Sequence, residues 1–229
     1  MRSASFIPVL HTPHMPQSVG RRAYWAATIG IGVLALWLAS FYAPVEASMG
    51  MVQKVVYLHI PAAAAALLAA TSAFGASLAY IWTRARVWDR VSFAASKVVV
   101  YSTLVVLATG MVWGKSEWGS WWTWSPKLTF TLILCVLYAA LLVIRLPVGR
   151  PRRAMAYAVC SVIAFLDAPL VYLSVNLLPD IHPNSLPLTS EMRLTLGVCL
   201  VFALLASAGF IAGTFGMSRE SIDATERLG

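Results

Sequence analysis

Long apolar runs alternate along this chain with short polar segments that hold most of its charged residues. Each of six apolar runs reaches the about 17–25 residues that a helix needs to cross a bilayer core of about 30 Å. The fourth run is the clearest, because no charged residue lies between Lys127 and Arg145. The pattern predicts an all-α integral membrane protein, a six-transmembrane-helix bundle that forms one domain over residues 1–229. The predicted spans are 24–43, 57–82, 92–113, 128–144, 154–176 and 194–217.

Composition supports the membrane assignment. Hydrophobic residues make up 59% of the chain and charged residues 11%, whereas soluble domains carry about 25% charged residues. The first run is too long for a signal-peptide core and no small-residue cleavage site follows it, so we interpret it as a true span. Residues 1–20 and 218–229 are predicted to be loosely ordered cytoplasmic tails.

The basic residues divide unequally between the two sides of the predicted bundle. Twelve lie before the first span, after the last span or in the connections 83–91 and 145–153, whereas the other side has only Lys54, Lys115, Lys127 and Arg193. Because cytoplasmic loops carry an excess of Lys and Arg, both termini are predicted to face the cytoplasm. The net charge of +8 reflects this bias, and we expect no nucleic-acid partner; the expected surroundings are membrane lipid.

The cysteines exclude two classes of redox protein. Cys135, Cys160 and Cys199 fall in three different spans, and the sequence contains neither a Cys-x-x-Cys pair nor a Cys-x-x-Cys-His haem-attachment motif. We therefore interpret all three as small packing residues, and the chain as neither a c-type cytochrome nor a thiol-exchange protein.

Two histidines are the candidate metal ligands. By the predicted topology, His59 at the start of the second span and His182 between the fifth and sixth spans both lie at the extracytoplasmic side. Either could be an interfacial polar residue with one hydrogen bond. As a pair on separate segments they could instead clamp a haem iron from both sides. Copper or zinc is the alternative, although no cysteine, methionine or carboxylate cluster completes such a site.

Five of the nine tryptophans are concentrated in the extracytoplasmic segment between the third and fourth spans. If this segment is helical, Trp118, Trp121 and Trp122 share one face, which could form a flat shelf for a porphyrin. Lys54, Lys115 and Lys127 lie on the same side and could pair with haem propionates. The alternative is an ordinary interfacial aromatic belt. The five tryptophans are Trp113, Trp118, Trp121, Trp122 and Trp124.

The tryptophan segment also carries a family resemblance. Its pattern, Trp-Gly-x-x-x-Trp-Gly-x-Trp-Trp-x-Trp, resembles the signature of haem-handling proteins of cytochrome c maturation. The six predicted spans, the length and residues 57–63 (Tyr-Leu-His-Ile-Pro-Ala-Ala) resemble the haem exporter protein C family, CcmC. The resemblance covers nearly the whole chain.

The resemblance implies a delivery protein of the bacterial inner membrane without catalytic turnover. In this family haem b is held at the periplasmic face by the tryptophan segment and two axial histidines, which correspond here to His59 and His182. Lys54 and Lys127 match basic positions that suit the propionates. The implied partners are the periplasmic haem chaperone CcmE, which receives the haem, and the subunits CcmA, CcmB and CcmD of an ABC-type complex.

Two departures from the family pattern affect the site. The family motif usually ends in Trp-Asp, whereas this chain has Ser125 and Pro126 after Trp124. Serine can cap a helix and proline fits its first turn, so we expect the fourth span to begin here with one negative charge fewer. Residues 177–181 also lack the tryptophan-rich, basic run that commonly precedes the second histidine.

Asp167 is an acid inside the fifth apolar run, two residues before Pro169. Intramembrane acids are often functional, so a role in proton movement is one interpretation. The preferred interpretation is that Asp167 satisfies backbone groups that a proline kink leaves free.

Two other functions remain open from the sequence. A b-type electron-transfer subunit is the first, although such proteins usually stack two haems and place the histidines within the spans. A structural transporter subunit whose tryptophans form only a belt is the second.

Overall fold

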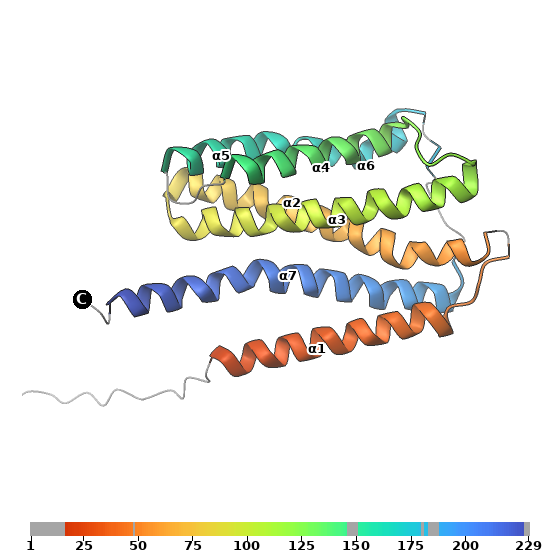
Figure 1. Cartoon of the computed structure of the whole chain (residues 1–229), viewed down its shortest axis with the longest axis horizontal. Coiled ribbons are helices and arrows are strands. Elements are labelled where there is room, and N and C mark those ends of the chain that lie inside the picture. The colour runs from red at the N-terminus through yellow and green to blue at the C-terminus, as the bar shows by residue number, and fades with distance from the viewer. Residues whose placement is uncertain (1–16, 48, 146–150, 180, 183–187, 227–229) are drawn as a thin grey trace, which may run out of the picture.

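The computed structural model describes residues 17–47, 49–145, 151–179, 181–182 and 188–226, and every regular element within these ranges is a helix, without a strand. All connections between spans are short, which places consecutive spans antiparallel to each other (Figure 1). The helices are α1 (Gln17–Trp37), α2 (Val56–Thr83), α3 (Arg86–Trp118), α4 (Pro126–Arg145), α5 (Pro151–Ala164), α6 (Asp167–Leu177) and α7 (Ser190–Glu226), with a π-helical turn η1 (Leu38–Tyr42) and a 3₁₀ turn η2 (Met51–Val55).

Six helical segments in the described part of the chain are long and apolar enough to cross a membrane, which confirms the predicted all-α, six-span class. Five of them are single helices with or without a terminal turn, whereas α5 and α6 together make the fifth span. The segments are Val19–Tyr42, Met51–Thr83, Arg86–Trp118, Pro126–Arg145, Arg152–Ser174 and Ser190–Gly213.

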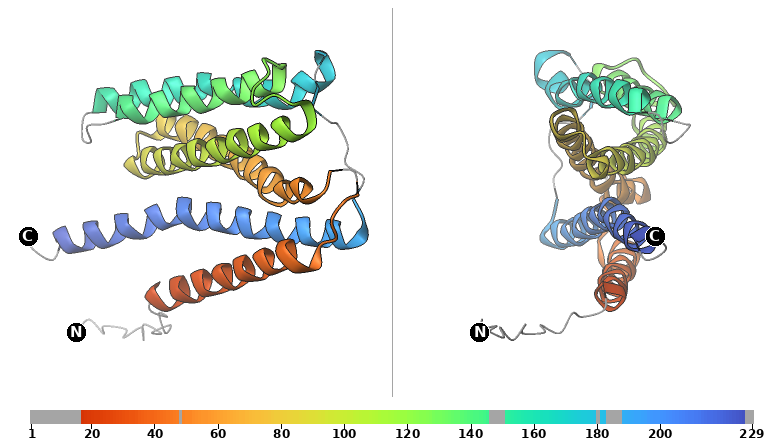
Figure 2. Two further views of the ribbon diagram at one scale, coloured as in Figure 1. Left: turned by 45° about the vertical axis from the view of Figure 1, so that its right-hand side comes forward. Right: turned by 90° about the vertical axis from the view of Figure 1, so that its left-hand side faces the viewer.

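The helices pack in successive layers (Figures 1 and 2). Helices α4, α5 and α6 lie on one side of the α2–α3 pair, α7 lies on the other side, and α1 packs outside α7. The turns from α1 to α2, α3 to α4 and α6 to α7 therefore gather at one end of the bundle, and both described ends of the chain lie at the opposite end. We call the end that holds these three turns the histidine end, because His59 and His182 lie there.

Small residues allow α2 and α3 to approach closely. Alanines of α2 form a buried stripe that faces α3 and α5, and Ala69, Ala70 and Ala73 are fully buried. Without a hydrophobic driving force between helices in lipid, such small residues gain stability from backbone proximity and van der Waals contact.

A buried ion pair fixes the end of the bundle opposite the histidines. Arg145, the last residue of α4, donates through Nε to Asp89 Oδ1 at 3.1 Å and through Nη2 to Asp89 Oδ2. Both side chains are buried, and the Arg145 guanidinium also lies over the Phe93 ring. A bidentate arrangement satisfies both charges, so the pair locks α3 against α4.

The fifth span breaks at Phe165 and Leu166, four and three residues before Pro169, the proline that the sequence singled out as the kink. Asp167 begins α6 and is buried, but its Oδ2 has no hydrogen-bond partner among the described residues. The kink is thus confirmed, whereas hydrogen bonding of this carboxylate oxygen to freed backbone groups is not observed.

Two helices extend beyond the predicted spans. Helix α7 continues to Glu226, through most of the tail that was expected to be loosely ordered, since residues 218–226 contain neither glycine nor proline to end it. Helix α3 continues past residue 113 to Trp118, because the polar residues Lys115 and Glu117 end the apolar run without breaking the helix.

Candidate functional site

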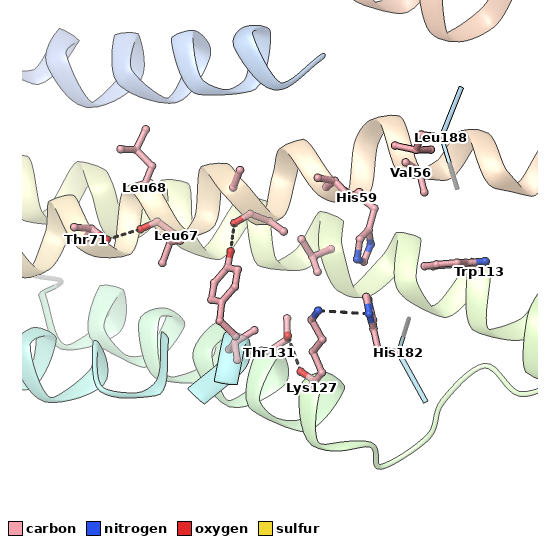
Figure 3. A pocket seen from close by; sticks show the side chains of 16 residues that line it. Val56, His59, Leu67, Leu68, Thr71, Trp113, Lys127, Thr131, His182 and Leu188 are labelled. Carbon is pink, nitrogen blue, oxygen red and sulfur yellow. Dashed lines mark hydrogen bonds between the residues drawn. The ribbon is translucent and has the colours of Figure 1, made fainter. Parts of the chain in front are cut away.

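Two histidines from distant parts of the chain face each other at the histidine end (Figure 3). His59 lies in the first turn of α2, and His182 lies in the segment between α6 and α7. Their ring centroids are 6.2 Å apart and the ring planes are inclined by 30°. The structure therefore brings together the two residues that the sequence placed on one side of the membrane.

Neighbouring helices hold the His59 ring through a hydroxyl group. His59 Nδ1 lies 2.9 Å from Thr109 Oγ1 on α3. The Thr109 hydroxyl in turn contacts two backbone carbonyl oxygens of its own helix, Val105 O at 2.6 Å and Val106 O at 3.1 Å. This contact orients the ring across the α2–α3 interface.

A lysine and a tryptophan surround His182. Lys127 Nζ, in the first turn of α4, lies 3.4 Å from His182 Nδ1. The Trp113 ring meets the His182 ring edge to face, with centroids 6.0 Å apart. Trp113 is buried, and its Nε1 has no hydrogen-bond partner in the part of the chain that the structure describes. An unpaired indole N–H beside an imidazole pair leaves a donor for a bound group.

A cavity of about 780 Å³ opens beside the histidines and extends along α2 toward the bundle centre (Figure 3). Its volume lies in the range of about 300–1,000 Å³ that ligand pockets occupy, and its titratable side chains His59, His182 and Lys127 gather at one end of a mainly apolar lining. The described lining residues are Val56, His59, Ile60, Ala63, Ala64, Leu67, Leu68, Thr71, Val106, Trp113, Lys127, Thr131, Val171, Tyr172, His182 and Leu188.

The predicted tryptophan shelf does not form. Gly119 adopts φ 72° and ends α3, and the following residues up to Ser125 are not helical, so Trp118, Trp121 and Trp122 do not share one helical face. Glycine accepts this left-handed conformation without the steric cost that a side chain brings. The helix ends here because Gly119, its C-cap residue, takes the left-handed conformation.

The five tryptophans consequently have different roles in the geometry. Trp113 lines the large cavity, and Trp118 lines a small annex of about 40 Å³ behind the two histidines. Trp121 and Trp124 are 58% and 75% exposed. Trp122 packs edge to face on Trp124, with centroids 5.5 Å apart. The segment thus combines one buried tryptophan, Trp113, with an exposed aromatic surface.

The two lysines expected at the site lie in different places. Lys127 lines the cavity beside His182, as expected. Lys54 instead donates to Ser40 O at 2.8 Å and lines a second cavity, of about 670 Å³, among α1, α2, α3 and α7. The structure does not bring Lys54 into the histidine cavity, because η2 turns its side chain toward α1 rather than toward α4.

The fourth span begins as predicted but without the predicted cap. Pro126 is the first residue of α4, and the Ser125 carbonyl accepts from Thr129 N at 3.0 Å. Ser125 Oγ is buried and has no hydrogen-bond partner among the described residues, so the expected hydroxyl cap is absent there.

Sequence reasoning missed Thr109 and Tyr172. Thr109 is a hydroxyl residue inside an apolar run, and its position opposite His59 depends on how α3 packs against α2. Tyr172 of α6 donates to Ala63 O at 3.3 Å and closes the deeper part of the cavity. Thr109 could have been singled out as an isolated polar residue within a span.

The two imidazoles of His59 and His182 favour a metal whose other ligands come from a bound molecule and not from the protein. Among the described residues no group of three histidine, cysteine, aspartate or glutamate side chains could hold a metal ion. Protein zinc sites need three or four protein ligands, so two imidazoles alone leave a bare copper or zinc ion incompletely held. The residues present fit a metal that a planar macrocycle already coordinates.

Fold and site together define a multi-pass membrane protein with a ligand cavity and a facing histidine pair at one end of its bundle. The family model of CcmC, Heme exporter protein C, matches residues 11–227. The chain therefore belongs to the CcmC family.

Individual relatives agree with this family. Heme exporter protein C of Escherichia coli K12 is 28% identical over 177 residues, which are 76% of this chain and 72% of the relative. Heme exporter protein C of Rhodobacter capsulatus is 38% identical over 124 residues, 53% of this chain, and that match spans about half of the relative (51%). A ccmC-like mitochondrial protein of Marchantia polymorpha, named for cytochrome c biosynthesis, is 28% identical over 186 residues, 80% of this chain and 78% of the relative.

Proposed function

We propose that this protein binds haem b between His59 and His182 and delivers it for the maturation of c-type cytochromes. The family supports haem delivery in cytochrome c biogenesis as the general role. The spacing of the two imidazoles is the observation that carries the specific site.

The distance between the rings suits one iron ion. A metal–imidazole bond is about 2 Å long and the ligating nitrogen lies about 1 Å from the ring centroid, so two axial imidazoles have centroids about 6 Å apart. The observed separation is 6.2 Å. Two rings at this distance can clamp one macrocycle without a large backbone movement.

The surroundings supply the other contacts that a porphyrin needs. The mainly apolar cavity beside the rings matches the macrocycle, and the Lys127 ammonium group can pair with a propionate. Trp113 offers an aromatic edge and an unpaired N–H at the same place. The exposed Trp121 and Trp124 extend this surface outward.

The distribution of basic residues supports an orientation. The end of the bundle opposite the histidines carries the connections rich in arginine and both described ends of the chain. The positive-inside rule then assigns the termini to the cytoplasm and the histidine end to the periplasmic side of a bacterial inner membrane. On that side the exposed tryptophans would meet the haem chaperone CcmE, with CcmA, CcmB and CcmD completing an ABC-type complex.

Delivery is favoured over the two other functions. An electron-transfer subunit needs a chain of redox centres across the bilayer, whereas both described histidines are at one end. A purely structural subunit does not require facing imidazoles beside a cavity. We therefore assign the protein a binding and hand-off role without turnover.

Titration of the detergent-purified protein with haemin tests this proposal. We expect a b-type spectrum, a loss of affinity of about tenfold or more in His59→Ala, and a changed spectrum in His182→Ala. His11→Ala is the matched control, because the sequence places this histidine in the N-terminal tail, and it should bind as the wild type does. A wild-type protein that takes up no haem would overturn the proposal.

A further inference from the structure

The two facing histidines have different hydrogen-bond partners at the same ring nitrogen. Nδ1 of His59 contacts a threonine hydroxyl, and Nδ1 of His182 contacts a lysine ammonium group. A neutral imidazole carries its proton on one nitrogen and accepts at the other, so the partner of Nδ1 decides which nitrogen is free to bind a metal.

Thr109 determines the tautomer of His59. A hydroxyl has one hydrogen, and that of Thr109 is engaged by its own helix, with Val105 O at 2.6 Å and Val106 O at 3.1 Å. The Thr109 oxygen can then only accept from His59, 2.9 Å away. Nδ1 of His59 therefore carries the proton, and Nε2 keeps the lone pair that a metal requires.

Lys127 imposes the opposite tautomer on His182. A lysine ammonium group has three donors and no acceptor, so Nδ1 of His182 must accept in the contact at 3.4 Å. A neutral His182 then carries its proton on Nε2. In this arrangement neither nitrogen is available, because the ammonium group occupies Nδ1 and a proton occupies Nε2.

We propose that Thr109 is a positioning residue that prepares His59 as the first axial ligand of the haem iron, and that His182 becomes the second ligand only after Lys127 releases it. This inference rests on the proposed function. A haem propionate supplies the means of release, because Lys127 lines the same cavity and a carboxylate is a stronger acceptor for its ammonium group than an imidazole.

When His182 binds the iron through Nε2, the ring loses one proton and gains one, so its net charge does not change. The ring loses the Nε2 proton to water and takes one from water at Nδ1, and the freed Nε2 lone pair forms the bond to iron. The reverse sequence removes His182 while His59 still holds the haem. His182 is therefore the ligand that hand-off would withdraw first.

The tautomers can be measured before any haem is added. We would record ¹⁵N spectra of the full chain in detergent with ¹⁵N-labelled histidine and with His11→Gln and His14→Gln, at a pH where the remaining rings are neutral. The inference predicts protonated Nδ1 in His59 and protonated Nε2 in His182, assigned with His182→Ala. The same tautomer in both rings would overturn it.

Variants separate the two hydrogen bonds. Thr109→Val removes the hydroxyl at nearly constant volume and should abolish the His59 preference and weaken haemin binding about tenfold, as loss of an outer partner of a metal ligand does. Thr109→Ser keeps the hydroxyl and should behave as the wild type. If Thr109→Val matches Thr109→Ser in both measurements, Thr109 does not position His59.

Lys127→Met should shift the His182 tautomer and leave that of His59 unchanged. Lys115→Met is the matched control, because Lys115 donates to Gly119 O at 2.9 Å away from the cavity, and it should change neither ring. An unchanged His182 spectrum in Lys127→Met would contradict the release step. A wild type that takes up no haem contradicts the proposed function, whereas equal tautomers contradict this inference whatever the titration gives.

Discussion

At the scale of single residues, two lysines that the sequence assigns to the same side of the membrane lie in different places in the structure. Lys54 and Lys127 both flank spans at the histidine end, yet only Lys127 lines the histidine cavity. The rotation of each side chain about its helix axis decides which cavity it reaches. Whether a residue can contact the bound ligand therefore depends on the helix face it occupies as well as on its side of the membrane.

The two lysines give a direct comparison. Lys127→Met should weaken haemin binding about tenfold, because a hydrogen bond to a charged group contributes about 1.5–3 kcal/mol. Lys54→Met removes the same charge from the second cavity and should leave the affinity within about twofold. Isothermal titration of the two variants checks this. Equal losses would mean that Lys54 reaches the haem after all.

The sequence predicted the histidine pair, Lys127 and Trp113 but not the threonine that contacts His59. His59 and His182 could be assigned to one side because each adjoins a span end, and span ends follow from the length of apolar runs. The contact of His59 with Thr109 could not be predicted, because it depends on the register between α2 and α3. Apolar periodicity in a membrane span does not encode that register.

At the scale of elements, the end of α3 determines how the tryptophans are presented. The helix carries Trp113 into the interior and ends with the more exposed Trp118, after which Gly119 stops it in the left-handed conformation. The predicted shelf required a helix through residues 118–122. Its failure follows from one glycine, whose φ of 72° the sequence does not reveal.

Gly119→Ala should therefore destabilise the protein by about 1 kcal/mol, the cost of a side chain in the left-handed region. Gly75→Ala is the control, since Gly75 lies inside α2 with open space around the added Cβ, and should be neutral or stabilising. The midpoint of thermal unfolding in detergent, at one scan rate, compares them. A midpoint for Gly119→Ala at or above that of the wild type would contradict the role of Gly119 as a helix stop.

At the scale of the whole molecule, the two ends of the bundle have different chemistry. One end gathers the histidines, the cavity mouth and the exposed tryptophans, and the opposite end carries the buried Asp89–Arg145 pair and the arginine-rich connections. The sequence could predict this polarity, because it resides in loop composition. The fifth span breaks at Phe165 and Leu166, one helical turn before Pro169, where a proline removes the i→i−4 hydrogen bond.

Cysteine labelling tests the proposed orientation. In a background with Cys135, Cys160 and Cys199 replaced by serine, Trp124→Cys at the histidine end should react with a membrane-impermeant maleimide added to spheroplasts. Thr83→Cys at the opposite end should react only after the membrane is opened. Both positions are exposed in the structure, so burial does not explain a difference. The opposite labelling pattern would place the histidine end in the cytoplasm.

The central claim is that one haem iron takes both histidines as axial ligands. Electron paramagnetic resonance of the ferric haem-loaded protein measures this most directly, because two imidazoles give a low-spin iron. We predict a low-spin signal in the wild type, high-spin haem retained in His182→Ala, and little bound haem in His59→Ala. A high-spin signal in the wild type, or a low-spin signal that survives both substitutions, would contradict the account.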